Sequence, residues 1–319
     1  MTNEPRTLME AVRYFADADR TLATMVSLRW PNGVYCPTCG RTDVRFIATR
    51  KLWECKEKHP RKQFSAKVGT IFEDSPLPLD KWFVAVWSIA NCKNGISSYE
   101  LSRAIGVTQK SAWHMLHRIR LAMEIGGFDK FDGTTEVDET YVGGLAKNMH
   151  ARKREARVTG TGGVDKAAVV GMLERGDADH ASRVRAQTIK DTNAKALQAV
   201  VRKNVNAGSM VVTDGLSAYR GLDADYLHQY VDHASEFVRG IVHTNGIENF
   251  WSLLKRSIKG TYVSVEPFHL DAYVTEQAFR FNERKANDAG RFKKVLSSVV
   301  GKRLTYQDLI THGAPQGAH

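Results

Sequence analysis

Three acidic residues in the second half of the chain have the types and spacing needed to hold divalent metal ions. Asp138 lies within the expected strand 134–142, and Asp214 ends the apolar run 209–213. Carboxylates at the ends of strands are well placed to bind hard cations such as Mg²⁺. Glu248 follows Asp214 by 34 positions, near the start of an amphipathic segment. The set predicts a metal site assembled from separate elements.

A cation on the last of these segments points to chemistry on phosphate groups. Lys255 follows Glu248 by seven positions, so the two side chains share one face of a helix expected over 247–257. The opposite side should be buried through its apolar residues, which are Ile247, Phe250, Trp251 and Leu254. A carboxylate that holds a metal beside a cation that holds phosphate suits phosphoryl transfer.

Two further polar residues have alternative roles. Asn245 lies three positions before Glu248 and is a second candidate for the third catalytic position, as a metal ligand or a substrate contact. We prefer Glu248 because a carboxylate neutralises a metal ion and an amide does not. Glu139, next to Asp138, should point to the opposite face of its strand and have a structural role.

The elements that must position these residues form a mixed α/β pattern. Short strands are expected over 134–142, 167–173, 183–189 and 209–213, and helices over 193–204, 247–257 and 268–285. Between the first two strands, residues 145–165 form a basic, glycine-containing loop. Its Arg152, Lys153 and Arg154 are predicted to contact DNA.

Clustered cysteines near the N-terminus predict a second metal site. Cys36 and Cys39 form a Cys-Pro-x-Cys-Gly knuckle, and Cys55 follows after 15 intervening residues, a spacing typical of zinc ribbons. His59 is the candidate fourth ligand, in place of the commoner second Cys-x-x-Cys. Four protein ligands leave no open position, so the single zinc should be structural. Cys92 is expected to be a packed core residue.

A helical region surrounds the cysteine hairpin. The first 30 residues predict a helix or a helix pair, and 79–90 predict an amphipathic helix. Two helices follow, over 98–105 and from 108 onward, with Gly106 at the turn, as in a helix-turn-helix. The second carries four side chains that could reach DNA: Gln109, Lys110, His114 and Arg118.

The overall charge favours a polyanionic partner. Lys and Arg number 46 against 35 Asp and Glu, which gives a net charge of +11. Basic proteins bind nucleic acid through phosphate contacts and counterion release. No apolar run is long enough to cross a bilayer, and the N-terminus lacks a secretory signal pattern, so we expect a cytoplasmic, nucleoid-associated protein without a membrane partner.

Several short sequence motifs together resemble those of one family, the IS1595 or ISXO2-like DDE transposases. The resemblance runs from about residue 30 to 285. It rests on the Asp, Asp, Glu and Lys spacing and on these segments: Cys36-Pro37-Thr38-Cys39-Gly40, Lys62-Gln63-Phe64-Ser65, Gly69-Thr70-Ile71-Phe72, Val137-Asp138-Glu139-Thr140-Tyr141-Val142-Gly143-Gly144, Thr213-Asp214-Gly215, Ile247-Glu248 with Phe250-Trp251-Ser252-Leu253-Leu254-Lys255-Arg256, and Phe279-Arg280-Phe281-Asn282.

The resemblance implies an RNase H-like catalytic domain with two Mg²⁺ or Mn²⁺ ions, preceded by a zinc ribbon. It implies cutting and joining of double-stranded DNA at the terminal inverted repeats of an insertion sequence, and insertion into target DNA. Synapsis of two ends implies a homodimer or a larger assembly on DNA. The chain departs from the family at His59, where a cysteine is expected, and some relatives have Asn as the third catalytic residue.

These inferences divide the chain into five parts. An N-terminal helical segment covers 1–33, the zinc ribbon 34–75, and the helix-turn-helix-like module 76–127. The RNase H-like domain covers 128–300, and a C-terminal tail 301–319. Two other functions stay open: a structure-selective RNase H-like nuclease, and a DNA-binding regulator derived from a transposase. The nuclease would not need modules that read a sequence, and the regulator would not need three spaced acids and a lysine.

Overall fold

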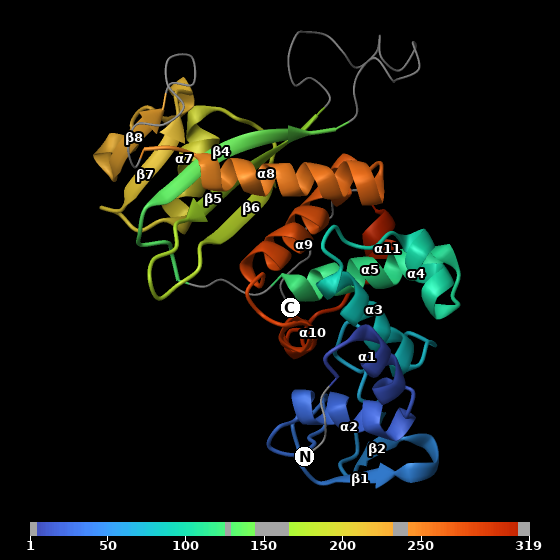
Figure 1. The fold of residues 1–319 in the computed structure, drawn as a ribbon. Helices are drawn as coiled ribbons and strands as arrows, with labels where there is room; N and C mark the ends of the chain where they lie inside the picture. The colour runs from blue at the N-terminus through green and yellow to red at the C-terminus, as the bar shows by residue number, and fades with distance from the viewer. Residues whose placement is uncertain (1–4, 125–128, 144–165, 232–241, 312–319) are drawn as a thin grey trace. The chain divides into compact units, whose positions relative to one another are not determined.

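The structure is a computed structural model that describes residues 5–124, 129–143, 166–231 and 242–311 (Figure 1). The chain divides into two compact units. The first contains residues 1–125 and 286–319, and the second contains residues 126–285. The sequence assigned everything from 128 to 300 to the catalytic domain, whereas in the structure the chain returns to the first unit from residue 286.

The first unit is mainly helical. Its aromatic core explains why the C-terminal part of the chain belongs to it: Phe292 packs against Phe15 at 5.3 Å and against Phe83 at 5.7 Å between ring centroids. A helix whose apolar side, formed by Phe292, Val295 and Leu296, has such partners is more stable in this unit than in solvent. The helices are α1 (Leu8–Phe15), α2 (Ala18–Arg29), α3 (Leu79–Asn91), α4 (Ser98–Ile105), α5 (Gln109–Met123), α10 (Asp288–Ser297) and α11 (Tyr306–Ile310).

A small antiparallel sheet lies between α2 and α3 in the sequence. Its strands β1 (Val44–Ile47), β2 (Leu52–Cys55) and β3 (Gln63–Phe64) pair in that order, as the predicted hairpin region requires. The Trp53 ring of β2 stacks on Phe64 at 6.2 Å and meets Trp30, at the end of α2, at 5.5 Å. Aromatic contacts therefore attach the sheet to the preceding helix.

The predicted pair of helices before residue 125 is present with its expected turn. A capping box between Ser97 and Glu100 begins α4, and Gly106 ends it in the left-handed conformation, with φ of 62°. Thr108 caps α5 by accepting a hydrogen bond from the backbone N–H of Ser111. The local sequence thus sets both helix boundaries.

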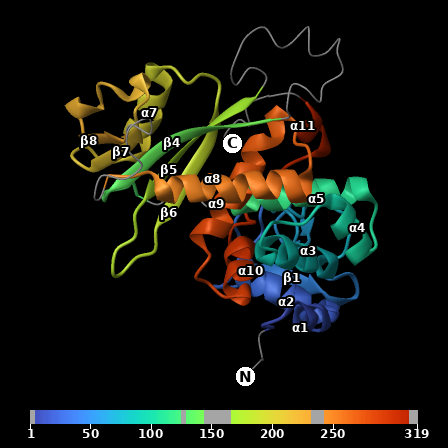
Figure 2. The ribbon, with the colours of Figure 1, turned by 45° about the horizontal axis from the view of Figure 1, so that its top comes forward.

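The second unit is built on a five-stranded sheet with helices on both faces (Figures 1 and 2). Its strand order is β6-β5-β4-β7-β8. The pairs β4–β5 and β5–β6 are antiparallel, and β4–β7 and β7–β8 are parallel. The strands are β4 (Thr135–Val142), β5 (Ala167–Glu174), β6 (Arg183–Ile189), β7 (Met210–Asp214) and β8 (Leu227–Val231).

Alternation along the strands directs side chains to two separate cores. On β5, Val169 and Leu173 pack with helices α8 (Asn245–Ser257) and α9 (Leu270–Asn282). The intervening Val170 and Met172 pack with α7 (Ala194–Asn204) on the other face. The period of two in a strand produces this division. The predicted strands and helices of this unit lie within three residues of the observed ends, and β8 was not predicted.

The outer edge of β6 is covered by α9. The Asn282 amide donates to the carbonyl of Val184 and accepts from its backbone N–H, at 3.0 and 2.7 Å. The Asp271 carboxylate accepts from the backbone N–H of Thr188 at 2.7 Å. Side chains therefore take the place of a sixth strand and satisfy backbone groups that an open edge would expose.

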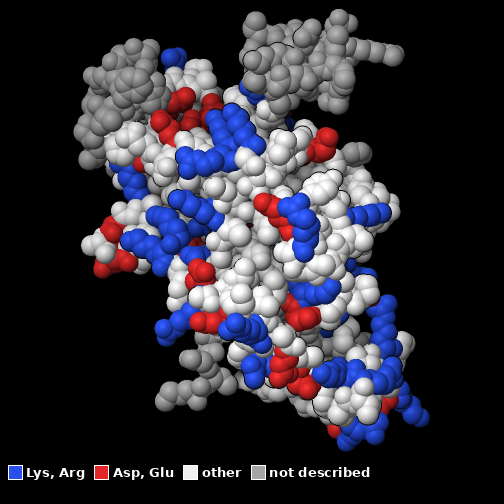
Figure 3. Space-filling view, turned by 45° about the vertical axis from the view of Figure 1, so that its right-hand side comes forward, with Lys and Arg blue, Asp and Glu red and all other residues white. Residues whose placement is uncertain are grey.

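The described helices include none that is long and apolar enough to cross a membrane. Figure 3 shows Lys and Arg side chains in several clusters on the face drawn, with Asp and Glu side chains between them. The positive charge visible on that face is therefore distributed rather than gathered into one patch.

Candidate active site and zinc centre

Sheet register brings the first two predicted catalytic acids together. Strands β4 and β7 run parallel, and Val137 on the first is in register with Thr213 on the second. One step further along both strands lie Asp138 and Asp214. Because neighbouring residues in register point to the same face of a sheet, both carboxylates belong to the face that α8 covers. Asp138 and Asp214 therefore become neighbours through strand pairing, although they lie far apart in the sequence.

Asp138 lies in a crowded, poorly hydrated position. Burial raises the pKa of its carboxyl to about 7, and the negative charges of Glu139 and Asp214 act in the same direction. Two hydrogen bonds oppose them. In the larger effect the indole N–H of Trp251 donates to Asp138 Oδ2 at 2.9 Å, and a smaller one comes from the backbone of Glu139. A carboxylate with these neighbours is destabilised until a positive charge joins it.

Glu139 points away from this pair, as the alternation of the strand predicts. Its Oε2 accepts a hydrogen bond from the hydroxyl of Tyr219 at 2.7 Å, and the Tyr219 ring lies in the core on the α7 face. Burial raises the pKa of Glu139, and the charge of Asp214 adds to this effect. The prediction that Glu139 faces the opposite side of the strand is confirmed.

A buried acid attaches the start of α8 to β4. Glu136 is 1% exposed, and its Oε2 accepts from the backbone N–H of Ile247 at 2.9 Å. Its Oε1 accepts from Arg175 Nε at 2.8 Å, and Arg175 also donates to the carbonyl of His243 at 2.7 Å. An added Cβ on Gly246 would come within 2.8 Å of Glu136, so a glycine is needed for this close approach.

Glu248 lies between two attachment points of α8. The first is the Ile247 N–H on Glu136 and the second is the Trp251 indole on Asp138, about 6 Å apart along the helix axis. Glu248 itself is exposed, and its Oε1 accepts from the hydroxyl of Thr244 at 2.7 Å. The helix is therefore fixed against β4 on both sides of the third predicted acid.

The other predicted residues of α8 are exposed. Asn245 is the first residue of the helix, and Lys255 lies in its last turn. The buried side of the helix contains the four apolar residues that the sequence predicted for it. The three predicted acids do not meet as tightly as zinc ligands do: among the described residues, the one group of three or more metal-ligating side chains close enough to hold a single ion is at the cysteine hairpin.

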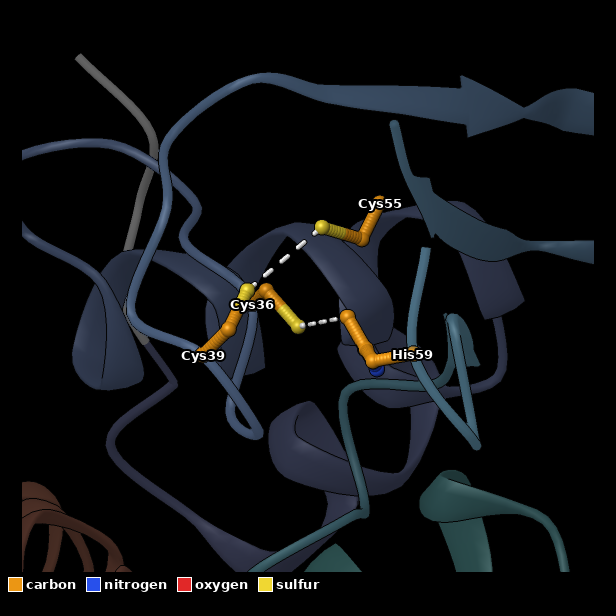
Figure 4. A group of neighbouring side chains, drawn as sticks. All are labelled: Cys36, Cys39, Cys55 and His59. Carbon is orange, nitrogen blue, oxygen red and sulfur yellow. Dashed lines mark hydrogen bonds between the residues drawn. The ribbon is translucent and has the colours of Figure 1, made fainter. Parts of the chain in front are cut away.

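At the cysteine hairpin, all four predicted zinc ligands come together (Figure 4). The ligand atoms of Cys36, Cys39, Cys55 and His59 lie within 4.8 Å of one another. Cys36 Sγ is 3.5 Å from His59 Nε2, and Cys39 Sγ is 3.6 Å from Cys55 Sγ. The His59 Nδ1–H donates to the carbonyl of Pro60 at 2.6 Å, which directs Nε2 toward the thiols. This is a metal-binding Cys₃His site.

The electrostatics of the hairpin favour a thiolate at the first knuckle. Burial by itself raises the pKa of Cys36, but hydrogen bonds from the backbone of Cys39 and Thr38, together with those from the Cys39 and Cys55 thiols, outweigh it and lower the pKa to about 7. Gly40 provides the turn that aims these N–H groups, with φ of 75°, a conformation that other residues rarely adopt. Thiolates are the form that binds zinc.

Two residues predicted to contact DNA, Arg118 and His114, have partners inside the first unit. Arg118 is 7% exposed and donates to the backbone carbonyls of Ile71, Glu73 and Leu304. His114 is half-buried, with its Nε2 3.3 Å from the carbonyl of Leu304. Arg118 therefore has an internal structural role and not the predicted DNA contact, because three backbone carbonyls hold its guanidinium inside the unit.

The first turn of α5 remains accessible. Lys110 is exposed, and its ammonium lies 4.4 Å from the ring centroid of Tyr306. Gln109 is half-buried and donates to the hydroxyl of Ser98 at 2.9 Å. The three basic residues predicted in the loop 145–165, namely Arg152, Lys153 and Arg154, lie outside the described residues.

Sequence patterns did not find the residues that hold the acids in place. Glu136 is separated from Asp138 by one residue, so alternation alone could have assigned it to the same face. Arg175 carried no local signal. Trp251 was predicted as a buried apolar residue, and its polar N–H was the available hint that it needs a partner.

Comparisons with known proteins agree with this geometry. Residues 130–282 match the ISXO2-like transposase domain, and residues 17–59 match the transposase zinc-ribbon domain. The chain belongs to the ISXO2-like (IS1595) transposase family. The first match contains the sheet with Asp138, Asp214 and Glu248, and the second ends at His59.

Two curated relatives carry names of the same kind. An uncharacterized protein in transposable element ISH50 of Halobacterium salinarum is 29% identical over 259 residues, covering 78% of this chain and 85% of the relative. An uncharacterized transposase-like protein of Haemophilus influenzae is 28% identical over 101 residues, covering 31% of this chain and 81% of the relative. This ISXO2-like chain therefore resembles the first relative over both of its units.

Proposed function

We propose that this chain is a DNA transposase that binds the terminal inverted repeats of an insertion sequence and cuts and joins DNA there by metal-dependent phosphoryl transfer. The observation that carries the proposal is the register of β4 and β7. Continued by one residue, this register puts Asp138 and Asp214 on the same face of the sheet, the face against which the helix that carries Glu248 packs. Membership of the ISXO2-like family and the mixed sheet with helices on both faces support an RNase H-like catalytic domain.

The three acids would hold two divalent ions, Mg²⁺ or Mn²⁺. Oxygen donors suit these cations, and the crowding that raises the pKa of Asp138 to about 7 is relieved by a positive charge. When bound, such ions activate the attacking oxygen and stabilise the leaving oxygen of a phosphodiester. Glu248 would join the site by exchanging its hydrogen bond to Thr244 for a metal contact.

The chain's own residues would orient the DNA. Lys255, two turns after Glu248 on the same helix, would bind a backbone phosphate as a point charge. Asn245, at the exposed N-terminus of α8, is the alternative to Glu248 as third catalytic residue. Attachment of α8 to β4 on both sides of Glu248 would limit how far that carboxylate can move during the reaction.

Recognition of the DNA ends would be shared by the N-terminal modules and the basic loop 145–165 of the catalytic domain. We assign it to the zinc ribbon and to the first turn of α5, with Gln109, Lys110 and the half-buried His114 as contacts, and to the basic loop with Arg152, Lys153 and Arg154. Helix-turn-helix proteins read base edges with the N-terminal residues of their second helix. Pairing of two ends would require a homodimer or a larger assembly on DNA.

A strand-cleavage assay on the element's own ends tests the proposal. Asp214→Asn and Glu248→Gln should each lower the metal-dependent cleavage rate roughly 10³-fold, since a catalytic ion supplies several kcal/mol of transition-state stabilisation. Asp225→Asn is the matched control, because this acid forms an ion pair with Arg202 at 2.8 Å, outside the site. Its cleavage should equal that of the unsubstituted chain.

The same assay identifies the third residue. Retained metal-dependent cleavage in Asp214→Asn would overturn the assignment of the site. Loss of cleavage in Asn245→Ala, with activity kept in Glu248→Gln, would transfer the third position to Asn245.

A further inference from the structure

The indole of Trp251 occupies an unusual place between the helix and the sheet. It is 4% exposed and belongs to the hydrophobic core between α8 and the sheet. From that core its N–H reaches Asp138 Oδ2 at 2.9 Å. A tryptophan that served only to fill the core would not need an acidic partner on the central strand.

A glycine on the neighbouring strand makes this position possible. Gly171 of β5 is in register with Asp138 of β4. A Cβ at Gly171 would lie 2.5 Å from Trp251 Cη2, 2.7 Å from its Cζ2 and 2.9 Å from Ile247 Cδ1. Real Cβ atoms do not approach so closely, and the rigid ring has no room to move within the core. The missing side chain at Gly171 therefore lets the indole pack against β5 while its N–H reaches β4.

The hydrogen bond constrains one of the two oxygens of Asp138. A charge-assisted N–H···O⁻ bond is stronger and more directional than a neutral one. Together with a hydrogen bond from the backbone of Glu139, the indole donor limits the rotation of the carboxylate. Groups that hydrogen-bond a metal-ligating carboxylate orient it, and their loss typically lowers metal affinity or activity 10- to 100-fold.

We infer that Trp251 is a positioning residue for Asp138, which holds the carboxylate in the orientation that binds a divalent cation, and that Gly171 is the permissive position for it. The inference rests on the proposed function, because it takes Asp138 as a metal ligand. Trp251 acts through Asp138 and touches neither DNA nor the reacting atoms.

Direct binding of Mn²⁺ to the full, zinc-loaded chain tests the inference without DNA. Trp251→Phe keeps an aromatic ring and removes the N–H, so it should weaken Mn²⁺ binding 10- to 100-fold in a calorimetric titration. Gly171→Ala, which displaces the indole while keeping it in the chain, should weaken binding in the same range. Asp138→Asn should abolish Mn²⁺ binding at this site, and the heat that is lost identifies the part of the titration that belongs to it.

The matched control is Trp82→Phe in the first unit. The Trp82 indole is also buried, at 1% exposed, and donates to the Ser75 hydroxyl at 3.1 Å. The substitution therefore removes the same atoms and a comparable hydrogen bond from a place outside the site. It should lower thermal stability but leave Mn²⁺ affinity unchanged. The difference in Mn²⁺ affinity between Trp251→Phe and Trp82→Phe then measures the orientation of Asp138 separately from the loss of core packing.

The outcomes separate the inference from the proposed function. Mn²⁺ affinity in Trp251→Phe within twofold of the unsubstituted chain, with binding lost in Asp138→Asn, would overturn the inference alone. If Mn²⁺ binding is weakened in Trp251→Phe as expected, but the unsubstituted chain does not cleave repeat ends, the proposed function alone would be overturned. If Trp251→Phe does not fold, replacing Trp251 with its sulfur analogue benzothienylalanine removes the N–H at almost constant shape, and the same twofold limit applies.

Discussion

The zinc centre and the candidate active site differ in how the chain builds them. The four zinc ligands come from residues 36–59 and lie within 4.8 Å of one another. The three acids come from residues 138–248, on two strands and a helix, and Glu248 bonds to Thr244 rather than joining the other two. The zinc ligands are brought together by the local geometry of one hairpin. The acids come from separate elements, and we expect Glu248 to complete their site only when metal and DNA bind.

The largest predicted effect on either site is that of removing the zinc. Cys36→Ser should unfold the ribbon, because structural zinc in small modules supplies on the order of 10 kcal/mol of folding free energy. The second unit should stay folded, since its core contains no residue of the hairpin. Hydrogen exchange measured by unit checks this, together with zinc content.

Two further variants control the zinc experiment. Cys92→Ser changes a cysteine outside the cluster and should retain one zinc per chain. His59→Ala should release the zinc or weaken its binding. Full zinc content in His59→Ala would mean that another residue is the fourth ligand.

A second prediction concerns the attachment of α8. Glu136→Ala leaves Arg175 without its buried carboxylate and removes the acceptor for the Ile247 N–H. It should lower the free energy of unfolding of the second unit by about 3 kcal/mol. Cleavage should also fall, because Glu248 is carried by the released end of the helix. Urea unfolding and the cleavage assay measure the two effects.

The control for this attachment is Glu174→Ala. Glu174 also pairs with an arginine of the sheet, Arg183, at 2.5 Å, but does not contact α8. Its loss should lower stability by about 1 kcal/mol and leave cleavage unchanged. Equal losses of cleavage in the two variants would contradict a role of Glu136 in holding the helix.

A third prediction uses the pKa of Asp138, which burial raises from 3.8 to about 7. Between these values the folded chain keeps a proton that the unfolded chain has lost, so the stability of the metal-free protein should fall as the pH rises from about 4 to 7. Asp138→Asn removes this titration. At pH 8 and without metal, the variant should be more stable by on the order of 2 kcal/mol.

Calorimetric unfolding across that pH range measures the effect. Saturating Mg²⁺ should stabilise the unsubstituted chain at pH 8 and leave Asp138→Asn almost unchanged. An identical fall of stability with pH in both proteins would show that other groups produce it.

The smallest expected effect is on DNA binding. Lys110→Ala removes one exposed cation from the start of α5, so it should weaken binding to repeat ends by less than about 1 kcal/mol and reduce the salt dependence by about one ion. Arg118→Ala should instead lower the melting temperature, because three backbone carbonyls, two of them in buried contacts, lose their donor. Loss of DNA affinity in Arg118→Ala at full stability would restore Arg118 as a contact.

Much of the fold could be predicted from the sequence because the relevant patterns are local. The period of the apolar residues predicted α8 and its buried side, and the Cys-Pro-x-Cys-Gly knuckle predicted the ligands of the ribbon. Strand β8 was missed because its residues are mostly exposed, so it lacks an apolar alternation. Helix α10 was assigned to the catalytic domain because nothing in its own residues identifies Phe15 and Phe83 as the partners of Phe292.

By itself the sequence determined most of the helices and strands of the second unit, the four candidate zinc ligands and the resemblance to ISXO2-like transposases, since each depends on residue types at short spacings. Only the tertiary structure decided that Asp138 lies beside Asp214, that Glu136 and Trp251 hold α8 to β4, and that Arg118 is internal. Register and packing join residues tens to more than a hundred positions apart, and a one-residue slip would turn every side chain of a strand to the other face. Local periodicity contains no information about that choice.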